Sequence, residues 1–165
     1  MGLDVRGYSN IELVGSISEE GWEVICDCDD LLYIYSHNIE EFPEAAEGLQ
    51  AQGLYLYEDT ESGRISSYSG YGMWRDTLSR AILGVPAEEV WDDPDAFAGK
   101  PFVELINFSD CDGKIGTRVC TKLYETFMKY DPRIDIMDED WFVDIYETFI
   151  MVFNLGRKNG CVEFC

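Results

Sequence analysis

Residues 54–86 read LYLYEDTESGRISSYSGYGMWRDTLSRAILGVP, and the spacing of their apolar side chains changes partway along. The first half contains two β-prone runs, 54–57 and 65–68, separated by a turn-rich spacer, and this pattern predicts a hairpin. In the second half the apolar side chains recur at helical spacing, and a Gly-Val-Pro sequence from residue 84 is a typical helix end. The stretch therefore predicts strands that give way to a helix over residues 70–82.

The same kinds of pattern extend to both sides of this stretch. Two β-prone runs within residues 21–36 predict a second hairpin. Further along we expect a buried strand at 102–108, a turn at 109–113 with Gly113 to Gly116 opening a helix that ends at Asp131-Pro132, a last helix from Asp138 to near Gly156, and a strand at 161–164. Early strands and late helices predict an α+β fold, a mostly antiparallel sheet with about three helices packed on it. We expect one domain over residues 1–165, β-rich and acidic up to residue 63 and helix-rich from residue 64.

Acidic residues dominate the composition: 33 Asp and Glu stand against 12 Lys and Arg, a net charge of −21. Residues 1–63 contain 15 acids against Arg6 alone, whereas residues 64–130 contain 10 acids against eight Lys and Arg. A field of this sign repels phosphate backbones and anionic lipid, so we expect neither direct nucleic-acid binding nor membrane binding. It favours a basic protein surface as partner, for example that of a nucleic-acid-binding protein. The alternative is that the acid serves only to keep the protein soluble.

Two clusters of acids in residues 1–63 are the candidates for partner binding. One is spaced across Pro43 in a sequence that we expect to be exposed, and the other lies within the expected hairpin of residues 21–36. The candidate residues are Glu40, Glu41, Glu44 and Glu47 in the first cluster, and Asp27, Asp29 and Asp30 in the second.

Six cysteines bear on the compartment and on metal binding. No signal peptide precedes them, so we expect free thiols in a cytoplasmic protein. The Cys-Asp-Cys sequence at 26–28 has no second pair at zinc spacing, and His37 is the one histidine, so we expect no metal site and no cofactor. A calcium loop centred on Gly113 also fails, because Phe108 and Val119 would occupy ligand positions. Since no nucleophile with a paired base stands out, the pattern favours a binding protein over an enzyme.

Three unusual segments mark the last two-thirds of the chain. They are SYSGYGMWR at 67–75, PFVELINFSDCDGKIG at 101–116 and GCVEF at 160–164. In these segments the chain resembles a family of uncharacterised small bacterial and phage proteins. The resemblance implies no activity, and in residues 1–63 it covers only a Met-Gly-Leu-Asp start.

The first two of these segments together contain the parts of a small-molecule pocket. Aromatic surface, two cations and a helix N-terminus are features that suit a nucleotide-like anion. The candidate ligand-binding residues are Tyr71, Trp74, Arg75, Ser109, Asp110, Asp112, Gly113 and Lys114. The alternative is structural, because Tyr71 and Trp74 fall on the helix face assigned to the core and the aspartates can cap a helix and pair with Arg75.

Two hypotheses of different classes follow. The first is a non-enzymatic acidic protein that inhibits or neutralises a basic partner protein, as an immunity-type protein, a DNA mimic or a phage counter-defence factor does. The second is a nucleotide-binding domain or enzyme that uses the pocket around Trp74, Arg75 and residues 110–114.

Overall fold

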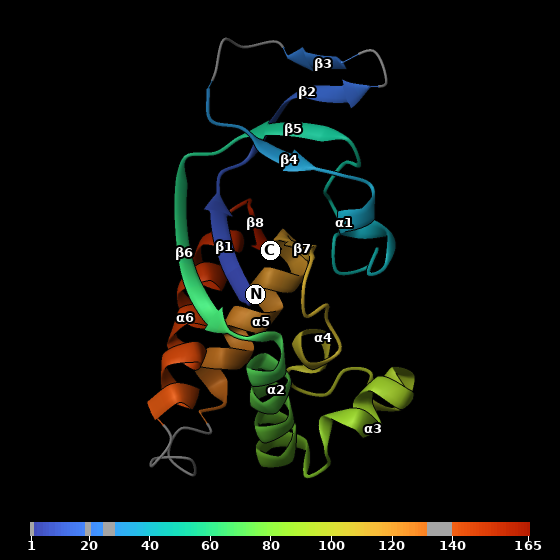
Figure 1. Ribbon diagram of the computed structural model, residues 1–165, viewed down its shortest axis with the longest axis vertical. Coiled ribbons are helices and arrows are strands. Elements are labelled where there is room, and N and C mark those ends of the chain that lie inside the picture. Colours follow the sequence, from blue (N-terminus) through green and yellow to red (C-terminus); the bar gives the residue numbers. More distant parts are fainter. Residues whose placement is uncertain (1, 19–20, 25–28, 132–139) are drawn as a thin grey trace.

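The computed structural model describes residues 2–18, 21–24, 29–131 and 140–165, and there the chain forms two four-stranded antiparallel sheets with helices around them (Figure 1). The predicted α+β class is confirmed, although the strands divide into two sheets. The strands are β1 Leu3–Ser9, β2 Glu12–Ser18, β3 Gly21–Val24, β4 Leu32–Ile34, β5 Gly53–Leu56, β6 Asp59–Ser66, β7 Gly113–Gly116 and β8 Cys161–Phe164. The helices are α1 His37–Glu40, α2 Tyr68–Leu83, α3 Ala87–Asp92, the 3-10 turn η1 Pro94–Phe97, α4 Val103–Ile106, α5 Thr117–Lys129 and α6 Asp140–Gly156.

The large sheet has the order β6-β1-β8-β7 and packs against α5 and α6, which lie behind it in Figure 1. Leu3 and Val5 of β1 are fully buried against this layer, as expected for alternate residues on one face of a strand. The packing is close, because a Cβ at Gly7 would lie 2.5 Å from the Val152 carbonyl oxygen of α6. The strand order also places the last strand of the chain, β8, inside this sheet, between β1 and β7.

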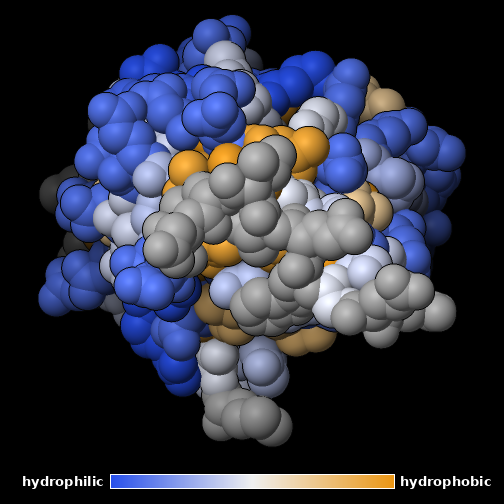
Figure 2. All heavy atoms as spheres, turned by 90° about the horizontal axis from the view of Figure 1, so that it is seen from above, coloured by the Kyte–Doolittle hydropathy of each residue, from blue (hydrophilic) through white to orange (hydrophobic). Residues whose placement is uncertain are grey.

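The small sheet has the order β3-β2-β5-β4 and forms one end of the molecule. It encloses a second apolar cluster that includes Leu32, Ile34 and Tyr55 together with Tyr8 and Cys161 from the large sheet. Figure 2 looks onto this end, where some hydrophobic residues reach the surface and hydrophilic residues predominate toward the rim.

Both predicted hairpins are wrong, because the two strands of each predicted hairpin pair with other strands and not with one another. Within residues 21–36, β3 pairs with β2 and β4 pairs with β5, so these two strands lie at opposite edges of the small sheet. The predicted spacer at 59–63 is not a turn but the first part of β6, which pairs along the whole of β1. Pairing with a distant strand overrides the local preference of Asp, Ser and Gly for turns.

Residues 102–116 also differ from the prediction. The predicted strand at 102–108 is helix α4, which begins after Phe102 in the left-handed conformation at φ 64°. Gly113 to Gly116 form strand β7, so the helix that they were expected to open begins at Thr117 instead. Short apolar runs fit a buried helix as well as a buried strand, which explains the first error.

The elements with strong local signals are confirmed. Helix α2 covers the predicted residues 70–82, and Gly84 ends it in the left-handed conformation at φ 75°. Helix α6 ends at Gly156 and β8 spans 161–164, both as predicted. The predicted first residue of the last helix, Asp138, lies outside the described residues.

The four described cysteines are free thiols and differ in exposure; Cys26 and Cys28 lie outside the described residues, so the expectation of six free thiols stays a prediction. Burial raises the pKa of Cys120 well above its usual range and raises that of Cys161 to about 12. Cys111 and Cys165 are exposed. The pKa of Cys165 is also raised, mainly because the surrounding protein shields its thiol in part from water.

Because the thiolate is the reactive form, we expect iodoacetamide at neutral pH to modify Cys111 first, Cys165 more slowly, and the buried Cys120 and Cys161 only on unfolding. Peptide mass mapping over a time course measures these rates. Rapid modification of Cys120 in the folded protein, or a disulfide in freshly purified material, would contradict this expectation.

Candidate functional site

The first acidic cluster lies on the surface, on α1 and the turns that follow it. Glu40, Glu41, Glu44 and Glu47 all have exposed side chains. This acidic segment, residues 37–49, lies beside β7 at the side of the molecule (Figure 1). The exposure predicted for these four acids is therefore confirmed.

The acidic segment is fixed to the sheet by backbone contacts. The Gly116 amide of β7 donates to the Ala45 carbonyl at 2.8 Å. A Cβ at Gly116 would lie 2.4 Å from the Glu47 carbonyl oxygen, so the segment can approach only because residue 116 is glycine. Arg118 at the start of α5 adds an ion pair with the Glu47 carboxylate and donates to the Glu44 carbonyl at 3.2 Å. The cluster thus has a defined position on the fold.

A partly buried polar network holds the beginning of the same segment. Lys114 Nζ donates to Glu163 Oε1 at 2.7 Å and to Asn38 Oδ1 at 3.2 Å, and the lysine side chain is only 2% exposed. Asn38 Nδ2 donates to Asp112 Oδ1 at 2.7 Å, and His37 Nε2 lies 3.2 Å from Asp112 Oδ2. Asp112 and Lys114, predicted to bind a ligand, are therefore engaged in positioning α1.

A second acidic stretch lies on α3 and η1 and was not predicted as a site. Five of the eight residues from 88 to 95 are acidic, and all five are exposed; they are Glu88, Glu89, Asp92, Asp93 and Asp95. Their charge is hidden in the overall composition because residues 64–130 are nearly neutral as a whole. A charge count in a short window would have found the stretch.

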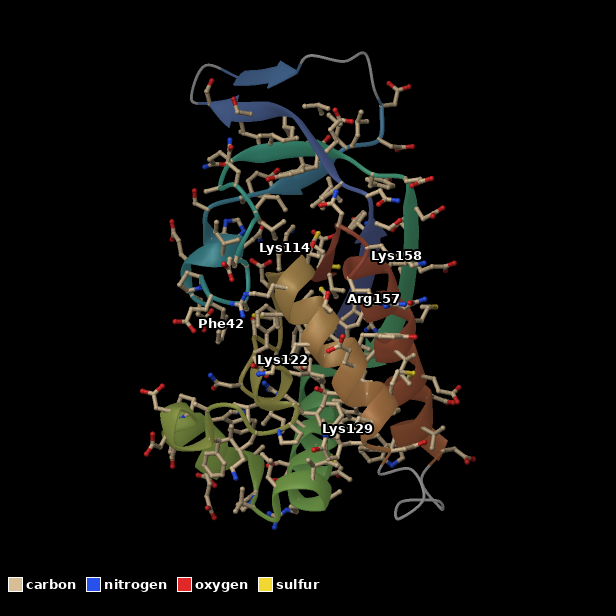
Figure 3. The ribbon with its side chains drawn as sticks, turned by 180° about the vertical axis from the view of Figure 1, so that it is seen from behind. Phe42, Lys114, Lys122, Lys129, Arg157 and Lys158 are labelled. Atoms are coloured by element: carbon tan, nitrogen blue, oxygen red, sulfur yellow. The ribbon has the colours of Figure 1, made fainter. Side chains whose placement is uncertain are left out.

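A groove separates the acidic segment from this second stretch. Its cavity volume is about 460 Å³. Its two walls include residues of the two acidic stretches. The other lining residues come mainly from α4, the loop after α4 and the start of α5. The lining residues are Glu41, Phe42, Pro43, Glu44, Ala45, Pro94, Asp95, Ala98, Gly99, Val103, Glu104, Asn107, Phe108, Arg118 and Val119. Figure 3 labels Phe42 between α1 and α3, which lie above and below it.

Arg75, the main cation of the predicted ligand pocket, is 6% exposed and makes internal contacts. Its Nη1 donates to the carbonyls of Phe108 at 2.6 Å and Ile106 at 3.2 Å. The guanidinium lies over the rings of Tyr71 and Trp91, at 4.5 and 4.9 Å from their centroids. These contacts fix α2 to α4 and to the loop that follows α4.

The other predicted ligand-binding residues are also distributed through the fold. Tyr71 and Trp74 are fully buried in the main core, and Gly113 is buried in β7. Ser109 and Asp110 lie on the loop before β7, where an Asp110 oxygen is 3.9 Å from Arg75 Nη2. None of the eight predicted residues is among the described residues that line the groove. The helix that was expected to begin at Gly113 begins at Thr117. The Gly116 amide just before it already donates to the Ala45 carbonyl.

The second predicted acidic cluster is placed only in part. Asp29 and Asp30 are exposed in the connection that leads to β4, and Asp27 lies outside the described residues. No three His, Cys, Asp or Glu side chains in the described ranges gather closely enough to hold a metal ion. None of the helices described combines the length and the apolar composition that a bilayer crossing requires.

In comparisons with known proteins, no family model, no curated protein and no solved structure matches the chain.

Proposed function

We propose that this protein binds a basic partner protein through the two acidic stretches that flank the groove. The observation that carries the proposal is their juxtaposition: Glu41 and Glu44 of the acidic segment line the same groove as Asp95 of the second stretch, although they are about 50 residues apart in the sequence. Folding concentrates negative charge there, and a partner with Lys and Arg complements it.

Two further features support this function over a purely solubilising role for the acid. The acidic segment is fastened by backbone and side-chain contacts, so its charges have defined positions rather than those of a loose tail. The groove between the two stretches includes the apolar residues Val103, Phe108 and Val119, and apolar groups within a charged rim are typical of a protein interface. A nucleic-acid-binding protein is the partner class we propose first, because its basic surface is built to meet closely spaced negative charges.

Charge reversal in the acidic segment is expected to weaken capture of the partner. The variant is the triple substitution Glu40→Lys, Glu41→Lys, Glu44→Lys. Because the three glutamate side chains are exposed and take part in no described hydrogen bond, the fold should remain intact. We expect affinity to fall by roughly tenfold or more. The measurement is quantitative mass spectrometry of basic proteins from host extract retained on the immobilised wild-type and variant proteins, followed by binding of each purified candidate.

The matched control is Glu12→Lys, Asp59→Lys, Glu61→Lys, which changes net charge equally at three exposed positions outside the groove. It should bind the same protein nearly as well as the wild type does. Equal losses in the two variants would show that only total charge matters, and the proposed site would be wrong. If the partner binds nucleic acid, double-stranded DNA should compete with this protein for it.

A further inference from the structure

The groove has an apolar interior as well as acidic walls. Phe42 enters from the acidic segment, Val103 from α4 and Val119 from α5, and Phe108 lies between them with its ring 4.9 Å from that of Phe42. Val103, Phe108 and Val119 are each at most 7% exposed, so they form a rigid base. A groove with an apolar base of this kind accepts an apolar side chain.

Three of the elements that line the groove also contribute acidic residues. Glu41 and Glu44 stand on the wall formed by the acidic segment, and Asp95 stands on the opposite wall. Glu104 pairs with Lys122 through Oε1, whereas its buried Oε2 has no hydrogen-bond partner among the described residues. Among the described residues of the lining, the one cation, Arg118, is already engaged with Glu47 and the Glu44 carbonyl. The groove therefore has acceptors without matching donors.

We infer that the groove binds a basic segment of the partner that inserts one apolar side chain between flanking lysines or arginines. This inference rests on the proposed function and names the chemistry of the partner at that site. The volume of about 460 Å³ is sufficient for an aromatic side chain together with the aliphatic stems of neighbouring lysines. Such a central anchor surrounded by charge is the usual organisation of an interface hot spot.

Two other occupants fit less well. A second copy of this chain would bring another −21 of net charge to the same acidic walls. A phosphorylated small molecule would meet Glu41, Glu44 and Asp95 without a free cation in the described lining. A segment with positive charge on both sides of an apolar residue satisfies both features of the groove.

The test uses two synthetic probe peptides of equal charge, Lys-Lys-Lys-Phe-Lys-Lys-Lys and the same peptide with Ala in place of Phe. Because the anchor ring is removed from water on binding, we expect the Phe peptide to bind roughly tenfold or more tightly than the Ala peptide. Fluorescence anisotropy measures the affinities. Amide chemical shifts should change for Val103, Asn107 and Val119 with the Phe peptide and change less with the Ala peptide.

Filling the groove tests the location independently. Ala98→Trp places an indole at a lining position and should remove the preference for the Phe peptide while binding of the Ala peptide stays within about twofold. Ala81→Trp, at an exposed position of α2 outside the groove, is the control and should keep the preference.

Equal affinity for the two peptides, or shift changes elsewhere than the groove, would overturn the inference. The proposed function would survive that result if both peptides still bind at low salt and the reversal of Glu40, Glu41 and Glu44 weakens both. If neither peptide binds at low salt, the proposed function and the inference both fail.

Discussion

Replacing Arg75 with alanine is expected to lower the free energy of unfolding by about 3 kcal/mol, because several buried contacts are lost together. The Phe108 carbonyl loses its donor at 2.6 Å, and the Ile106 carbonyl keeps only the Trp91 indole donor. The rings of Tyr71 and Trp91 lose the guanidinium that lies between α2 and α4. A ligand-binding arginine on a pocket surface would not have this effect.

Urea denaturation followed by tryptophan fluorescence measures the change. Arg80→Ala on the same helix is the control, since Arg80 is exposed and pairs with Asp76 at i,i+4, an interaction worth about 0.3–0.5 kcal/mol. If Arg75→Ala is as stable as Arg80→Ala, the structural role assigned to Arg75 is wrong and the nucleotide hypothesis regains its cation.

Substituting Gly116 with alanine is expected to displace the acidic segment and to destabilise the protein by about 2–3 kcal/mol. The new Cβ would lie 2.4 Å from the Glu47 carbonyl oxygen, and the 2.8 Å hydrogen bond from the residue 116 amide to Ala45 would be strained. Residue 116 has φ −79°, which alanine adopts freely, so the effect comes from the crossing segment alone. Partner binding should weaken although no charge has changed.

Hydrogen exchange of the amides of residues 37–49 measures the displacement, and denaturation measures the stability. The control is Gly72→Ala on α2, where a Cβ meets nothing within 4 Å and alanine should stabilise the helix by about 0.5–1 kcal/mol. Unchanged exchange in Gly116→Ala would show that the segment does not depend on this close approach.

The parts of the fold that were predicted correctly are those determined by local sequence. Helix α2 has its apolar residues at helical spacing, a Ser67 side chain that accepts from the Gly70 amide, and Gly84 at its end. Each of these signals lies within a few residues of the structure that it specifies, so no information from the rest of the chain was needed.

The errors arose where distant residues decide the structure. Residues 59–63 contain turn-forming residues, yet they form a strand because β1 offers a partner over its whole length. Residues 32–34 pair with residues 53–55 and not with residues 21–24, which are nearer in the sequence. Alternation of apolar and polar residues predicts a strand, but strand order depends on the assembled core.

The same division applies to the candidate site. The exposure of Glu40 to Glu47 followed from composition and from Pro43, and the structure agrees. The groove could not be predicted, because its two acidic walls and its apolar base come together only through the tertiary fold. Arg75 and Lys114 were assigned to a ligand for the converse reason: sequence does not reveal that Arg75 Nη1 donates to internal carbonyls and that Lys114 Nζ donates to the Glu163 carboxylate.

The most direct test of the account is the association rate constant with the identified partner, measured by stopped flow at low and high ionic strength. A complementary acidic site accelerates encounter by about 10- to 1000-fold, and salt screens this gain. We predict a rate for the wild type and for Glu12→Lys, Asp59→Lys, Glu61→Lys that falls steeply with salt, and a slow, nearly salt-independent rate for Glu40→Lys, Glu41→Lys, Glu44→Lys. Association that is indifferent both to salt and to reversal of the acidic segment would contradict the proposal that this surface binds a basic partner.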